Sequence, residues 1–177
     1  MAPAPTTAAP NLDPRAQRTR GALFDAFKVL VLEVPYAQLR VEDILRCARV
    51  SRSTFYQHFD GKDDLLTQSM DPLLRALADP NDIQGLRSSR VVLEHFWENR
   101  RYAEAIFDGP AGIAVLDHLT RLHEQATQST VAPLPARRLA CRAAAHGQLG
   151  ILLDWLTGRL QADLHTVVEA ITALRPR

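Results

Sequence analysis

The stretch from Val41 to Leu66, VEDILRCARVSRSTFYQHFDGKDDLL, constrains the fold more than any other part of the chain. Val41, Ile44, Leu45 and Ala48 recur at three- and four-residue spacing, as on the buried side of a short helix. Gly61 marks a break before the acidic pair that follows Lys62, and such residues favour a helix start. The stretch therefore predicts two short helices, a tight turn between them, and a third helix beginning near Lys62.

The second of these helices has clear start signals. Ser51 suits an N-cap whose hydroxyl accepts a hydrogen bond from an amide of the first turn. Phe55 then falls where it can pack on Val50, and Phe59 lies one turn later on the same face. We expect both rings to point inward and to steady a helix of barely two turns.

The rest of this helix is rich in groups that can bind phosphates or base edges. They are the side chains of Arg52, Ser53, Thr54, Tyr56, Gln57 and His58. Lys62 at the positive end of the next helix is unfavourable unless it has an outside partner, for which a DNA phosphate is the natural candidate. Spacing alone fits an ordinary helical hairpin equally well.

The order of residue types from Leu39 to Leu66 resembles the helix-turn-helix of TetR-family transcriptional regulators. By that resemblance, a double-stranded DNA operator is the partner, and the DNA-binding residues are Arg40, Arg49, Ser51, Arg52, Ser53, Thr54, Tyr56, Gln57, His58 and Lys62. The family usually has Gly at the position of Arg49, where a left-handed conformation costs a non-glycine residue about 1 kcal/mol. It often has Thr, as a helix cap, at the position of Arg40. Either arginine could instead contact phosphate.

Composition narrows the class further. A net charge of +1 over 177 residues argues against a generic polyanion binder, and the basic charge is local to the motif. The two cysteines, Cys47 and Cys141, show no disulfide or metal spacing and predict reduced thiols in a cytoplasmic chain. No signal peptide, membrane span, nucleotide loop or zincin motif is recognisable. We expect no cofactor, no metal and no enzymatic activity.

The whole chain is predicted to be all-α. Residues 1–12 are expected to form a disordered tail, 13–61 a three-helix head, and 62–177 a helical body. The resemblance makes the head a helix-turn-helix DNA-binding domain and the body a ligand-binding and dimerisation domain. Asp13 and Pro14 suit the start of the first helix. Pro72 should kink or break the helix that joins the head to the rest.

The last two predicted helices, 136–157 and the one capped by Asp163, carry a small-residue stripe and an apolar stripe. From the residues alone, folding back within the chain and pairing with a second copy are equally good explanations. The resemblance implies a homodimer reading a palindromic operator. Its expected interface is Ala140, Ala143, Gly147, Gly150, Ile151, Val167, Ile171 and Leu174.

The resemblance also implies a chamber for a small apolar or aromatic effector. Candidate lining residues are His95, Phe96, Trp97, Tyr102, His118 and Trp155. The resemblance also implies that the protein represses transcription and that such an effector releases it from DNA. The alternative is a helical protein-interaction scaffold that keeps the head fold without reading DNA.

Overall fold

The computed structural model of the chain describes residues 13–78, 90, 93–94, 96–98, 100–107, 110–128 and 133–176. These residues fold into helices joined by turns, without a strand among them, so the predicted all-α class is confirmed. The predicted disordered tail lies outside the described residues. None of the described helices combines the length and apolar character needed to cross a membrane.

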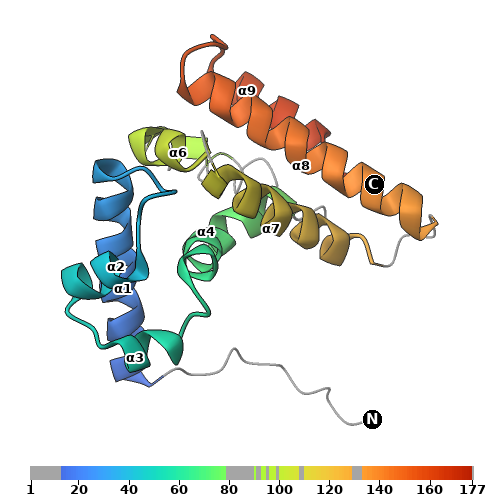
Figure 1. Cartoon of the computed structure of the whole chain (residues 1–177). Helices are drawn as coiled ribbons and strands as arrows, with labels where there is room; N and C mark the ends of the chain where they lie inside the picture. The colour runs from blue at the N-terminus through green and yellow to red at the C-terminus, as the bar shows by residue number, and fades with distance from the viewer. Residues whose placement is uncertain are drawn as a thin grey trace.

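Three helices form the N-terminal head, which lies at one end of the molecule in Figure 1. They are α1 (Pro14–Glu33), α2 (Val41–Ala48) and α3 (Arg52–Tyr56). The carboxylate of Asp13 accepts a hydrogen bond from the backbone N–H of Arg15 at 3.0 Å, and Pro14 follows in the first turn, as predicted. Leu23, Phe27 and Ile44 are fully buried and form the centre of the head.

Helix α4 (Lys62–Ala78) joins the head to the C-terminal body. Helix α4 continues through Pro72, so the sequence-based alternative of a break there is wrong. Its apolar face is continuous across the proline, because Met70, Leu74 and Leu77 are all buried.

The body contains α6 (Arg100–Phe107), α7 (Pro110–Ala126), α8 (Leu134–Leu156) and α9 (Leu164–Ala173). Helix α7 lies between α4 and α8, and α9 runs back alongside α8 (Figure 1). Pro110 opens the first turn of α7. Asp163 caps α9 through the N–H of Thr166 at 2.9 Å, as predicted.

Candidate nucleic-acid interface

Helix α3 is closed by local hydrogen bonds at both ends, of which the sequence predicted the first. The Ser51 hydroxyl accepts from the N–H of Thr54 at 3.1 Å, which is the expected N-cap. Helix α3 itself ends at Tyr56, so Gln57 and His58 lie in the turn after it. The two amides that follow, of His58 and Phe59, both donate to the carbonyl of Phe55. Helix α3 is therefore shorter than expected but tightly closed.

Buried aromatic rings fix α3 against the head. Phe55 and Phe59 are 0% and 2% exposed, and their ring centroids lie 5.6 Å apart. Phe59 also packs edge-on against Phe24 of α1 at 5.6 Å. The guanidinium of Arg20 lies 4.8 Å from the Phe59 ring centroid, which covers this pair from the α1 side. The expected inward orientation of both phenylalanines is confirmed.

The polar groups of α3 face away from this core. Tyr56 is 46% exposed, and Arg52, Ser53 and Gln57 are exposed as well. The Arg52 guanidinium donates to Glu42 of α2 at 2.6 Å and lies 5.5 Å from the centroid of the Tyr56 ring. These side chains form one accessible surface, which we call the α3 face. It comprises Ser51, Arg52, Ser53, Thr54, Tyr56, Gln57 and His58.

The two departures from the family pattern have different structural consequences. The Arg40 side chain has no acceptor for a first-turn amide, and only the reciprocal bond of a capping box forms, in which Asp43 accepts from the Arg40 backbone N–H at 3.3 Å. Arg49 is the only described residue other than glycine with a positive φ, at φ 55° and ψ 42°. The left-handed turn conformation is thus present, and both arginine side chains are exposed.

Lys62 has partners within the head, contrary to the expectation that it needs one outside. Its Nζ donates to the backbone carbonyls of Tyr36 and Leu39 at 2.7 and 3.0 Å, and lies 4.4 Å from the Tyr36 ring centroid. The lysine thereby closes the loop between α1 and α2. The Tyr36 hydroxyl donates to Asp63, and burial, then that hydrogen bond and the negative charge of Asp63, raise the pKa of Tyr36. The unfavourable cation at the helix start is compensated by these internal contacts.

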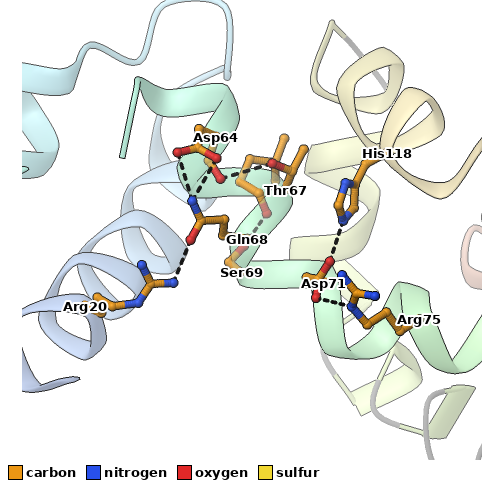
Figure 2. Close-up of polar contacts among 9 residues, drawn as sticks. Arg20, Asp64, Thr67, Gln68, Ser69, Asp71, Arg75 and His118 are labelled. Carbon is orange, nitrogen blue, oxygen red and sulfur yellow. Dashed lines mark hydrogen bonds and ion pairs between the residues drawn. The ribbon is translucent and has the colours of Figure 1, made fainter. Parts of the chain in front are cut away.

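Polar contacts connect α4 to both halves of the molecule (Figure 2). On the head side, Arg20 donates to the Gln68 amide oxygen at 2.7 Å, and the Gln68 nitrogen donates to both oxygens of Asp64. On the body side, Asp71 bonds His118 of α7 at 2.8 Å and also Arg75 at 2.6 Å. Burial alone raises the pKa of Asp71, but the hydrogen bonds from Arg75 and His118 bring it below its ordinary value.

Of the six expected effector residues, the structure describes the side chains of four, and two of these line one cavity. Trp97 and Trp155 line the same cavity, with ring centroids 4.7 Å apart. Phe96 is buried in the core against Phe107, and His118 bonds Asp71. His95 and the side chain of Tyr102 lie outside the described residues.

The residues expected at the dimer interface divide into two groups. Val167 and Ile171 are each 1% exposed within a single chain, so assigning them to an intersubunit surface was wrong. Their stripe packs inside the subunit and leaves no area for a partner. A Cβ on Gly147 would lie 2.9 Å from Cδ1 of Leu174, so this glycine makes room for α9 of its own chain. Ala140, Ala143 and Gly150 are exposed, and Ile151 is half-buried.

A buried polar junction in the body was missed by sequence reasoning. His123 of α7 and Gln148 of α8 are both 0% exposed, and Nε2 of His123 bonds Oε1 of Gln148 at 2.9 Å. The Gln148 nitrogen donates to the carbonyls of Leu77 and Ile171, and Arg175 donates to those of Ala76 and Leu77. The carbonyls of Ala76 and Leu77, near the end of α4, thereby accept from α8 and from Arg175, just beyond α9. The available signal was the position of Gln148 on the buried stripe that includes Cys141, Ala144, Ala145 and Leu152.

The protonation state of His123 follows from this geometry. The amide oxygen of Gln148 accepts, so Nε2 carries the proton, and Nδ1 is buried without a partner among the described residues. Burial lowers the pKa of His123, the Gln148 hydrogen bond raises it, and the positive charge of Arg175 lowers it, with a net decrease. The neutral ring is therefore the native form, and the folded state loses stability as the pH falls below the ordinary histidine pKa.

Comparison with known proteins identifies the head. Residues 23–68 match the family model described as "Bacterial regulatory proteins, tetR family". The head of the chain is therefore of the tetR type. The matched segment runs from the first buried leucine of α1 into the first turns of α4, so it contains the capped turn, the α3 face and the aromatic pair.

Two curated TetR-like relatives match part of the chain. The uncharacterized HTH-type transcriptional regulator YxbF of Bacillus subtilis is 42% identical over 57 residues, which is 32% of this chain and 15% of that protein. The dhaKLM operon transcriptional activator DhaS of Lactococcus lactis is 29% identical over 91 residues, or 50% of this chain and 49% of that protein. The chain thus matches less than half the length of either relative.

Solved structures extend the likeness to the body. A TetR transcriptional regulator from Streptococcus agalactiae has a TM-score of 0.58 at 22% identity, covering 92% of this chain and 96% of that one. NalD of Pseudomonas aeruginosa, described as the secondary repressor of a multidrug efflux pump, has a TM-score of 0.52 at 23% identity, with 90% and 94% covered. At these identities the likeness concerns the fold, namely a helix-turn-helix head followed by a helical body.

Proposed function

We propose that this TetR-family chain is a transcriptional repressor that binds a palindromic operator in double-stranded DNA as a homodimer and is released by a small effector. The observation that carries the proposal is the α3 face. It is an exposed set of hydroxyl, amide and guanidinium groups on a helix held rigidly by two buried phenylalanines. In this proposal residues 13–61 are the DNA-binding head and residues 62–177 the regulatory body.

The α3 face has the chemistry of base and phosphate recognition. Gln57 can pair with adenine and Arg52 with guanine in the major groove, whereas the hydroxyls of Ser53 and Thr54 suit phosphates. In the free protein Arg52 bonds Glu42, so this guanidinium exchanges one acceptor for another when it enters the groove. The exposed Arg40 and Arg49 lie at the two ends of α2 and would add phosphate contacts. Lys62 contributes by holding the α1–α2 loop.

The homodimer follows from the size of α3. Five residues of helix reach only a few base pairs, and a two-fold axis doubles the site and makes it a palindrome. Exposed residues of α8 are the candidate surface for the second subunit. They are Leu139, Ala140, Ala143, His146 and Gly150, none of which is covered by α9. Here the α8 stripe, and not the buried side of α9, meets the partner.

A genomic selection tests DNA reading directly. Purified protein is mixed with sheared genomic DNA at low salt, bound fragments are sequenced, and affinity for the recovered site is measured at several salt concentrations. We expect an enriched inverted repeat and a fall in log K that is linear in log salt. Gln57→Ala should lower specificity at one position of the site, whereas Arg159→Ala in the distant α8–α9 turn should leave the site unchanged.

The alternative is a helical interaction module that retains the head without reading DNA. The net charge of +1 and the internal contacts of Lys62 and Arg52 favour it. Retention of all genomic fragments alike, or of none, at low salt would support this module over the repressor.

A further inference from the structure

The Arg52 guanidinium of the α3 face is held beside a carboxylate from another helix. Its Nη1 donates to Oε1 of Glu42, the second residue of α2, at 2.6 Å. The guanidinium also lies 5.5 Å from the centroid of the Tyr56 ring, which packs edge-on against buried Phe55 at 5.3 Å. An ion pair and a cation–π contact therefore hold the two charged groups side by side.

Both charged groups are open to solvent. The side chains of Arg52 and Glu42 are 64% and 52% exposed. A hydrogen bond from its own backbone N–H lowers the pKa of Glu42 most, desolvation raises it, and the bond from Arg52 lowers it again, with a net decrease. The pair thus presents N–H donors beside an ionised acceptor, and the bonded nitrogen and oxygen lie 2.6 Å apart.

A G·C base pair has the complementary arrangement in the major groove. Guanine offers two neighbouring acceptors, N7 and O6, and cytosine offers the N4 amino group as a donor. The hydrogen bond from N4 to O6 within the base pair keeps these two atoms about 2.9 Å apart. This spacing is close to the 2.6 Å between Nη1 of Arg52 and Oε1 of Glu42. An A·T pair has no two adjacent acceptors, because the adenine N6 donor separates N7 from thymine O4.

We propose that Glu42 is a base-reading residue that acts together with Arg52 to select a G·C pair. In the complex Arg52 donates to N7 and O6 of guanine, and the carboxylate that it leaves accepts from N4 of the paired cytosine. Both charged groups then have partners, whereas at a phosphate the carboxylate is repelled. This inference rests on the proposed function, because it names one base pair of the operator.

Selection of bound DNA by variants locates the base pair. Arg52→Ala identifies the position of the half-site that Arg52 reads, which should be G·C. Glu42→Ala should lower the preference for G·C at that same position by about fivefold. It should also raise affinity for unrelated DNA by up to about fivefold, because a negative charge leaves the interface and Arg52 becomes available to phosphates.

Asp154→Ala is the matched control for the loss of an exposed ion pair. Asp154 pairs with Arg159 at 2.8 Å near the distant α8–α9 turn, and the two side chains are 51% and 62% exposed. This variant makes the same change of charge as Glu42→Ala and should leave the selected site unchanged. A half-site in which the position read by Arg52 is not G·C, or in which Glu42→Ala leaves the G·C preference intact, would overturn the inference.

Methylation of the cytosine amino group tests the contact itself. N4-Methylcytosine still pairs with guanine, but a methyl group takes the place of the N–H that faces the major groove. The original chain should bind an operator modified at this cytosine about fivefold more weakly, and Glu42→Ala should bind the modified and unmodified operators equally. Equal losses in both proteins would refute the contact of Glu42 with cytosine. If the original chain still enriches an inverted repeat, that result refutes this inference alone, whereas the absence of any enriched repeat refutes the repressor proposal as well.

Discussion

Arg49 is a residue at which backbone conformation and DNA contact can be separated by experiment. Its φ of 55° and ψ of 42° lie in the left-handed region, which costs a residue with a Cβ about 1–2 kcal/mol. Replacement by glycine removes this cost but increases the entropy of the unfolded chain by roughly 0.4–1 kcal/mol. The exposed side chain contributes little packing. Arg49→Gly should therefore raise the free energy of unfolding by about 0.8 kcal/mol.

Arg49→Ala is the matched control, because it removes the same guanidinium but keeps a Cβ in the left-handed conformation. We expect its free energy of unfolding to stay within about 0.5 kcal/mol of the original. Urea denaturation of the three proteins at one fixed protein concentration measures the difference, and glycine should add about 2–3 °C to the melting temperature. Equal stability of the glycine and alanine variants would refute the strain argument.

The same pair of variants tests the phosphate contact. If Arg49 binds a phosphate, both substitutions remove that contact, and the slope of log K against log salt should become shallower by about one. Stability and DNA affinity then change in opposite directions for the glycine variant alone. An unchanged slope of log K against log salt in both variants would mean that Arg49 does not contact a phosphate.

Three further outcomes follow from the packing. Phe59→Ala should lower the free energy of unfolding by about 3–5 kcal/mol and abolish operator binding. The exposed Val29→Ala should change neither quantity. A Phe59 variant as stable as the original would contradict the stabilising role of the Phe55–Phe59 pair. Gly147→Leu should lower the melting temperature by crowding Leu174, and Leu174→Ala should restore it; sedimentation at high concentration shows whether the subunits still pair. The unfolding free energy should fall as the pH drops below about 6.5, and this slope should shrink in His123→Gln but not in exposed His146→Gln.

Features of the head that depend on neighbours in sequence were predictable. The left-handed conformation at Arg49 was expected from the family resemblance alone. The Ser51 cap and the inward Phe55 and Phe59 arise from residue type and spacing over a few positions. Local backbone preferences and helical periodicity determine them, and both can be recognised in a single sequence. The same reasoning predicted the caps of α1 and α9.

Contacts between distant segments were not predictable. Lys62 bonds carbonyls more than twenty residues earlier, and a Cβ on Gly147 would crowd the side chain of Leu174, the residue that follows α9. The sequence showed that a lysine at a helix start and a glycine inside a helix are both unfavourable, but several partners could have explained either residue. The apolar stripe of α9 illustrates the same point, because periodicity identifies a buried face without telling whether its own chain or a second copy covers it.

The cavity lined by Trp97 and Trp155 and the head are connected through contacts that meet at α4. Trp155 follows Gln148 by two turns on the buried side of α8, and Gln148 and Arg175 together donate three hydrogen bonds to the last carbonyls of α4. At its other end, α4 bonds Arg20 of α1 through Gln68. A guest that changes operator affinity tenfold must bind the two arrangements of α4 with affinities that differ by about 1.4 kcal/mol. One hydrogen bond contributes roughly 1 kcal/mol, so rearranging the contacts of Gln148 and Arg175 is sufficient in magnitude to carry that coupling.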